Sequence, residues 1–156
     1  MKSLHLTDAD FRPLADFSLA WRWTRESHAL LSEAELRELS PLSSDAAHRI
    51  AEIARMLHRV DGIDRSHAAE VRVCETEAAS DEDVAAWLCN LPVNPSSLVI
   101  ASWDRHTALR LPWGLFARRW SDFCYPSSDD VTLLPPDGSW VCAYHHFGLL
   151  EWARAA

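Results

Sequence analysis

The chain has 156 residues, of which 48% are hydrophobic and 24% charged, the balance of a globular domain of ordinary size. Its formal net charge of −8 argues against binding to nucleic-acid phosphates, because that class of protein needs a basic surface. An acidic surface favours a basic partner, although it also serves plain solubility. No apolar run approaches the ~20 residues that span a bilayer, and the first residues lack the apolar stretch of a secretory signal. We therefore expect a cytoplasmic protein with no membrane partner.

Four cysteines occur, Cys74, Cys89, Cys124 and Cys142, and they show no C-x-x-C spacing. Thiols stay reduced in the cytoplasm, so we interpret these residues as small buried hydrophobes.

The first third of the chain predicts a strand and a short helix. Apolar side chains alternate with polar or small ones over residues 17–23, which is the period of a strand with one apolar face. Ser32 followed by Glu35 forms a capping-box signature, so we expect a helix over residues 33–39 that ends before Pro41.

The longest predicted helix begins after Ser43 or Ser44, and Gly62 is well placed as its C-terminal cap. Its apolar side chains recur at helical spacing and form one stripe: Ala46, Ala47, Ile50, Ile53, Ala54, Leu57 and Val60. The polar side chains lie mostly off that stripe, and we interpret them as a solvated face: His48, Arg49, Glu52, Arg55, His58 and Arg59.

Residues 63–79 are polar, so we expect an irregular connection there, with a short edge strand as the alternative. Ser80 followed by Asp83 predicts the start of another helix over residues 81–90. The two prolines and the polar turn formers of residues 90–97 predict a loop after it.

A sheet is predicted from residue 98 onward. Residues 98–103 and 107–111 form one hairpin, residues 131–134 and 140–144 form a second, and residues 149–153 form a last strand. Between the hairpins, Pro112 opens a short helix with four residues on its apolar face: Trp113, Phe116, Ala117 and Trp120. The prediction is a single α+β domain over residues 1–156, with N-terminal helices packed on a C-terminal, mainly antiparallel sheet.

The densest polar cluster runs from Tyr125 through Ser127 and Ser128 to Asp129 and Asp130. Serine and aspartate after a proline satisfy their own backbone in turns, so one interpretation is purely structural. The other is a partner-binding loop, in which the carboxylates bind a cation or a basic side chain.

His145 and His146 follow the strand that starts at Trp140. Adjacent strand residues point to opposite faces, so the two rings are poor joint ligands for one metal ion. One of them could join Asp129 or Asp130 in a site with nitrogen and oxygen ligands, but no recognised ligand spacing supports it. We therefore predict no metal and no cofactor.

The motifs that announce common enzymes are absent. There is no G-x-S-x-G elbow, and four glycines in the whole chain leave no phosphate-cradling loop. Cys124 or Cys142 could pair with His145 as a nucleophile, yet both lie among apolar residues where an inert thiol is the better interpretation. No catalytic residue is predicted.

Eight tryptophans form the other signal in the composition. Four of them are predicted in the core: Trp87, Trp113, Trp120 and Trp140. The other four are left open: Trp21, Trp23, Trp103 and Trp152. Exposed tryptophans beside acidic residues would make an aromatic-anchored binding surface.

The C-terminal third contains a W-x-x-F-x-x-P-S-S-D-D-V block followed by a tryptophan strand and a histidine. The matching positions are Trp120, Phe123, Pro126, Ser127, Ser128, Asp129, Asp130, Trp140 and His145. On these positions, residues 98–154 resemble a family of small uncharacterised bacterial proteins. In size, acidity, tryptophan content and lack of a catalytic motif, the whole chain is similar to immunity proteins of bacterial polymorphic toxins. No binding residue is carried over from this second likeness.

Three hypotheses follow. The first is an acidic immunity protein that neutralises a basic toxin domain by direct binding, with contacts at Trp103, Asp104, Asp129 and Asp130. The second is an enzyme or small-ligand binder whose pocket is formed by these residues: Tyr125, Asp129, Asp130, His145 and His146. The third is a structural subunit that buries tryptophans at a two-fold axis. A concave pocket where carboxylate and imidazole converge would favour the second, and a flat acidic face with exposed aromatics the first.

Overall fold

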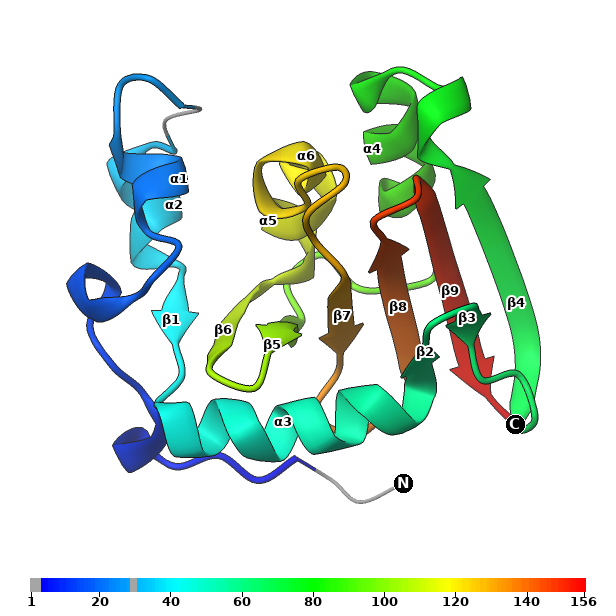
Figure 1. The fold of residues 1–156 in the computed structure, drawn as a ribbon, viewed down its shortest axis with the longest axis horizontal. Coiled ribbons are helices and arrows are strands. Elements are labelled where there is room, and N and C mark those ends of the chain that lie inside the picture. The colour runs from blue at the N-terminus through cyan, green and yellow to red at the C-terminus, as the bar shows by residue number, and fades with distance from the viewer. Residues whose placement is uncertain (1–3, 29–30) are drawn as a thin grey trace.

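A seven-stranded antiparallel sheet forms the framework of the computed structural model, which describes residues 4–28 and 31–156 (Figure 1). From one edge to the other the strands are β1 (Ser40–Pro41), β6 (Thr107–Pro112), β5 (Leu98–Asp104), β7 (Val131–Leu134), β8 (Trp140–His145), β9 (Leu149–Ala155) and β4 (Ala68–Glu75). The predicted α+β class, both predicted hairpins and the last strand are confirmed. Residues 63–79 contain the edge strand that was the alternative expectation, although it is longer than expected, because β4 pairs with β9 along its length.

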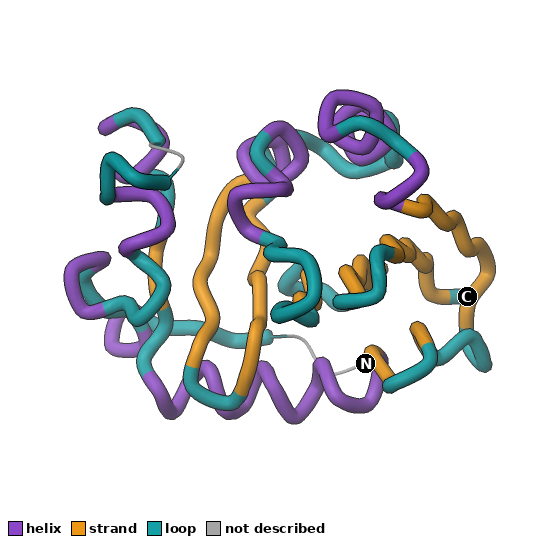
Figure 2. The backbone as a smooth tube through the Cα atoms, turned by 45° about the horizontal axis from the view of Figure 1, so that its top comes forward, coloured by secondary structure: helices purple, strands orange, loops and turns teal. Residues whose placement is uncertain are grey.

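Both faces of the sheet are covered by helices (Figure 2). The long helix α3 (Ser44–Leu57) packs on one face, where Ala46, Ala47 and Ile50 meet Ile100 and Leu134. The other face is covered by three short helices: α4 (Asp81–Cys89), α5 (Trp113–Arg118) and α6 (Trp120–Phe123). Because the central strands are buried on both faces, β7 and β8 consist entirely of buried residues.

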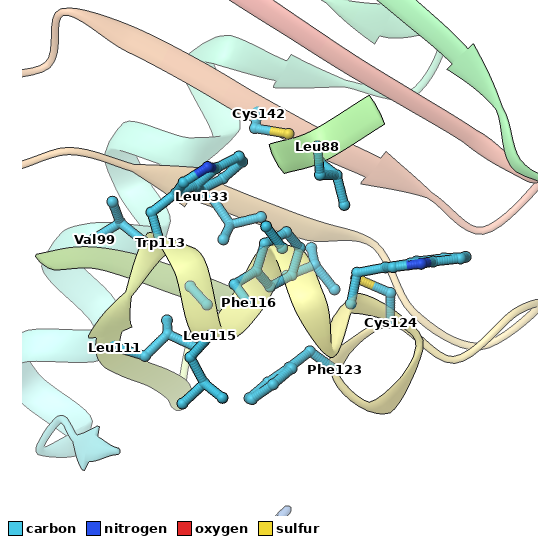
Figure 3. Close-up of a cluster of buried hydrophobic side chains, with 14 of the residues drawn as sticks. Leu88, Val99, Leu111, Trp113, Leu115, Phe116, Phe123, Cys124, Leu133 and Cys142 are labelled. Carbon is cyan, nitrogen blue, oxygen red and sulfur yellow. The ribbon is translucent and has the colours of Figure 1, made fainter. Parts of the chain in front are cut away.

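The core on the α4–α6 side is aromatic (Figure 3). The Trp113 ring lies 5.6 Å from that of Phe116 and 5.2 Å from that of Trp140. Ring pairs at these separations add to the free energy gained by burial alone. This face therefore contains the tryptophans that the sequence placed in the core, with the exception of Trp87, which is only partly buried.

Serine caps begin three helices as predicted. The Ser32, Ser43 and Ser80 hydroxyls accept backbone N–H groups at the starts of α2 (Glu33–Arg37), α3 and α4. A serine oxygen in this position satisfies one of the unpaired donors of the first turn. The helix expected over residues 113–120 is divided at Arg119, after which the Trp120 indole N–H donates to the carbonyl of Asp81 at 3.0 Å.

Two predicted elements are wrong. Residues 17–23 form turns and the short helix α1 (Trp21–Thr24) rather than a strand, because Phe17 and Trp23 stack on each other, with centroids 5.9 Å apart, in the core. Gly62 does not cap α3, which ends at Leu57. Instead, β2 (His58–Arg59) and β3 (Gly62–Ile63), each two residues long, pair as a small antiparallel hairpin beside the main sheet.

The remaining short elements are 3-10 turns: η1 (Asp8–Asp10), η2 (Leu14–Asp16) and η3 (Thr76–Ala78). Among the described residues, no helix has both the length and the apolar character needed to cross a membrane.

Candidate functional site

A pocket of about 480 Å³ opens where the C-terminal end of α3 passes over β5, β7 and β8. Five of the residues singled out in the sequence line it: Trp103, Asp104, Asp130, His145 and His146. Tyr125 and Asp129 do not line it. The pocket therefore brings together carboxylate and imidazole groups from separate strands.

Four side chains form a continuous hydrogen-bond chain beneath this pocket. The Thr132 hydroxyl lies 2.7 Å from His58 Nδ1, His58 Nε2 lies 2.8 Å from His145 Nδ1, and His145 Nε2 lies 2.9 Å from Glu151 Oε1. His145 and Glu151 are each 1% exposed. The chain thus leads from a buried carboxylate on β9 to the wall of the pocket.

The carboxylate sets the direction of these hydrogen bonds, since an ionised Glu151 can only accept. His145 then donates from Nε2, and its Nδ1 is assigned as the acceptor of His58 Nε2–H. His58 Nδ1 in turn accepts from the Thr132 hydroxyl. This tautomer assignment follows from the network and makes every member satisfied.

Glu151 is held ionised by its surroundings. Its Oε1 accepts the backbone N–H of Ile63 at 3.0 Å, and its Oε2 accepts from the guanidinium of Arg65. Burial raises the pKa of Glu151, but the hydrogen bonds from Arg65, Ile63 and His145 outweigh it and leave the pKa below its ordinary value. The result is a fixed negative charge behind His145.

Gly62 makes this arrangement possible. Its φ of +139° favours glycine, and a Cβ built there would lie 2.7 Å from Glu151 Oε1. The glycine predicted as a helix cap therefore lets the β2–β3 hairpin approach the buried carboxylate.

His58 was predicted on the solvated face of the long helix, and that prediction is wrong. The helix ends one residue earlier, and His58 has an extended backbone that pairs with Ile63. The half-buried ring then faces the sheet. Burial lowers the pKa of His58 to about 4, so the ring is neutral at pH 7.

Asp130 and His146 stand at the mouth of the pocket. Asp130 Oδ1 accepts the backbone N–H of His146 at 2.9 Å and lies 3.0 Å from its Nδ1. Partial burial raises the pKa of Asp130, but these two bonds outweigh it and lower the pKa overall. His145 is buried whereas the side chain of His146 is 52% exposed, so the adjacent rings point in different directions.

Three groups of this site could hold a metal ion. His58, His145 and Asp130 each offer one ligand atom, and these atoms lie within 4.8 Å of one another. The sequence suggested that one strand histidine could join Asp130, but it contained no sign of the third ligand. His58 is 87 residues from His145, and only the fold brings the two together.

Asp129 lies apart from this site. It is 8% exposed and pairs with buried Arg22 through two bonds of 2.6 and 3.2 Å, while its Oδ2 also accepts the backbone N–H of Tyr125. Its carboxylate is therefore used inside the fold. Asp129 does not line the pocket, and its bonds give it a structural role; a contact between Asp129 and a partner stays a prediction.

The other predicted contacts differ in exposure. Asp104 is exposed, and its Oδ1 accepts the backbone N–H of His106 at 2.8 Å. Trp103 is half-buried, and its indole N–H donates to the carbonyl of Phe123 at 3.0 Å. Of the four tryptophans left open in the sequence, Trp23 and Trp152 are core residues at most 1% exposed, and Trp21 and Trp103 are partly buried.

The tryptophans are thus largely used within the chain itself, and none is among the large exposed hydrophobic residues. A partner-binding surface or a two-fold interface built on fully exposed tryptophans therefore lacks support from these side chains, and both hypotheses stay predictions. Comparisons with protein-family models, with curated proteins and with solved structures found no match. The resemblance of residues 98–154 to a bacterial family therefore stays a prediction.

Proposed function

We propose that the protein binds a small anionic molecule in the pocket beneath α3. The observation that carries this proposal is the convergence of three histidines and two aspartates in a concave site bordered by three arginines. A volume near 480 Å³ lies within the range of small-molecule sites. A concave pocket of this kind is the observation that the sequence analysis named as favouring the ligand-binding hypothesis over the hypothesis of a flat protein-binding face.

The arginines supply the preference for an anion. Arg55, Arg59 and Arg105 line the pocket, against two aspartates, in a chain whose overall charge is −8. The closest acidic contacts are long, 3.9 Å from Arg55 to Glu52 and 3.6 Å from Arg59 to Asp64. Neither distance is a hydrogen bond, so both guanidinium groups keep donors for a ligand. Planar guanidinium groups suit phosphate and carboxylate oxygens.

The test is binding of simple anions at constant ionic strength. Inorganic phosphate, pyrophosphate and citrate are titrated by calorimetry into the wild type and into a double variant, Arg59→Gln with Arg105→Gln. We expect at least one anion to bind and the double variant to lose about tenfold or more in affinity, as for the loss of charged hydrogen bonds. The control is Arg37→Gln, an exposed arginine on α2.

An equal loss in Arg37→Gln would mean that the anions respond only to overall charge. Absence of binding by all three anions, with the folded state intact, would contradict the proposal.

The immunity hypothesis is the second candidate, and the net charge favours it. Exposed carboxylates occur at the first turn of α4 and at the pocket mouth: Asp81, Glu82, Asp83, Asp104 and Asp130. Such a surface would steer association with a basic toxin domain in a bacterial cytoplasm. Charge reversal at Asp104 and Asp130 should then release a basic protein that co-purifies from the source cells. Retention of that protein by the reversed variant would exclude these two contacts.

A further inference from the structure

We propose that His58, His145 and Asp130 form a binding site for one divalent transition-metal ion, such as Zn²⁺, at the inner end of the pocket. Two imidazoles and one carboxylate are ligands that such ions accept, with positions left for other ligands. The ion would also give the anion a ligation point. That part rests on the proposed function, whereas binding of the ion does not.

The donor atoms need only small movements to bind an ion. His58 Nε2 and His145 Nδ1 are 2.8 Å apart, and two nitrogens on one tetrahedral Zn²⁺ would be about 3.3 Å apart, given bonds of about 2.0–2.1 Å. Opening the pair by about half an ångström suffices. Asp130 has a half-exposed side chain that can turn toward the rings. Both bonds from His146 go to its Oδ1, so Oδ2 can serve as the ligand.

The second partner of each ring supports this assignment. His145 already donates from Nε2 to Glu151, which directs the lone pair of Nδ1 toward His58 and Asp130. Metal-binding histidines in proteins commonly donate their other ring N–H to a carboxylate in this way. His58 Nδ1 is held by Thr132 at 2.7 Å, which directs Nε2 to the same point.

The only change of proton position that ion binding requires is a change of tautomer at His58. Its ring proton moves from Nε2 to Nδ1, and the Thr132 hydroxyl changes from donor to acceptor. His145 keeps its Nε2–H bond to Glu151, and neither ring loses a proton overall. The hydrogen-bond chain and the ligand set are thus two states of the same side chains.

The lining of the pocket indicates what the remaining coordination positions would bind. The three ligand residues line a pocket that also contains Arg59 and Arg105. An oxygen of a phosphate or carboxylate could ligate the ion while its other oxygens accept from the arginines. The mixed nitrogen and oxygen set suits Zn²⁺ or Co²⁺ better than Mg²⁺ or Ca²⁺, which prefer oxygen ligands.

The experiment uses the full chain without an affinity tag, treated with a chelator and then dialysed. Calorimetric titration with Zn²⁺ should give one ion per chain, and Co²⁺ should give visible absorption bands of nitrogen and oxygen ligation. His58→Gln and Asp130→Asn should each lower the Zn²⁺ affinity at least tenfold. Circular dichroism and thermal unfolding confirm that each variant is folded.

His48→Gln is the matched control, because His48 lies on α3 with a half-exposed side chain whose ion-pair partner is Glu52, at 3.8 Å. This variant should bind Zn²⁺ as the wild type does. The proposal is overturned if the wild type binds no ion stoichiometrically, if His48→Gln loses as much affinity as His58→Gln, or if folded His58→Gln and Asp130→Asn both bind normally.

Anion titrations of the same proteins separate the two proposals. Zn²⁺ binding without anion binding would support the metal site and contradict the proposed anion-binding function. Equal anion binding by the wild type with chelator and by His58→Gln, together with no Zn²⁺ binding, would support the anion-binding function and contradict the metal site.

Discussion

Two buried ionic groups hold distant parts of this chain together, and they differ in what they leave open. Arg22 and Asp129 have side chains 7% and 9% exposed and join residues 107 positions apart. Glu151, His145 and His58 join β9, β8 and the hairpin after α3, but their hydrogen-bond chain ends at the wall of a pocket. We call the Arg22–Asp129 pair the closed group, because neither residue lines this pocket, and the Glu151–His145–His58 chain the open group, because it reaches the pocket wall.

The closed group makes its side-chain bonds inside the fold. Asp129 accepts from both Arg22 and the backbone of Tyr125, and the guanidinium carbon lies 3.9 Å from the centre of the Tyr125 ring. It fastens the 125–130 loop to the N-terminal segment. The open group has equally buried anchors, yet its outer members lie beside exposed Asp130 and three arginines. Burial of charge alone therefore does not mark a functional site; convergence on accessible space does.

The largest expected effect is on the closed group. Arg22→Ala would leave the Asp129 carboxylate buried without its cation, which costs about 3–5 kcal/mol in the free energy of unfolding. Chemical denaturation measures it, and Arg119→Ala, which breaks a more exposed pair with Glu35, should cost about 1 kcal/mol or less. A loss from Arg22→Ala no larger than that control would show that the closed group is not a stabilising contact.

The second prediction concerns Glu151, which orients His145. Glu151→Gln removes the charge behind the ring and should lower the Zn²⁺ affinity about 10–100-fold, as found for such carboxylate partners. The measurement is the same calorimetric titration, with Glu75→Gln on the exposed side of β4 as control. Unchanged affinity in a folded Glu151→Gln protein would separate the hydrogen-bond chain from the metal site.

The third prediction concerns Gly62. Gly62→Ala combines an unfavourable φ with a Cβ only 2.7 Å from Glu151 Oε1, so we expect a loss of about 1–3 kcal/mol and a weaker metal site. Gly138→Ala has a positive φ of 69° too, but it lies in the turn between β7 and β8. If the two variants bind Zn²⁺ equally well, the close approach of Gly62 to Glu151 does not matter for the site.

The smallest effect uses the buried thiols as reporters. Burial raises the pKa of the Cys124 thiol, which lies beside the closed group. Burial also raises the pKa of the Cys142 thiol, and the negative charge of Glu151 raises it further. In the native protein a thiol reagent should modify exposed Cys89 first, with Cys124 and Cys142 protected. Arg22→Ala should speed modification of Cys124 more than that of Cys142, measured by mass spectrometry of peptides. Equal acceleration would mean that the two regions open together.

Local patterns in the sequence were enough to predict most of the elements. Serine caps, the apolar stripe of the long helix and the alternation in the β5–β6 and β7–β8 hairpins depend on neighbours a few residues apart. They were confirmed except at the end of the stripe, where Val60 lies beyond α3 and is 94% exposed. The strand predicted over residues 17–23 is wrong because its alternation was also only a local pattern. The burial of Trp23 against Phe123, 100 residues further on, determines the structure of this segment instead.

The candidate site was predictable only in part. Asp130, His145 and His146 stood out because they lie close together in the chain, and the structure brings all three to one pocket. Asp129 carried the same signal but is buried by an arginine from the N-terminal segment. Nothing in local spacing distinguishes these neighbours, because both lie in the loop just before β7 and only tertiary contacts separate them: Asp129 pairs with Arg22, and Asp130 accepts from His146.

The α+β class, the caps and the hairpins follow from periodicity and turn chemistry within short windows of the chain, so they could be predicted before the fold was known. The chain of hydrogen bonds through His58, Thr132, His145 and Glu151, and the room that Gly62 makes for it, arise from long-range packing. These groups come from four segments between residues 58 and 151, and their distances depend on how the β2–β3 hairpin closes over β9. A site assembled by long-range packing has no characteristic spacing of its residues along the chain, so it could not be predicted from the sequence.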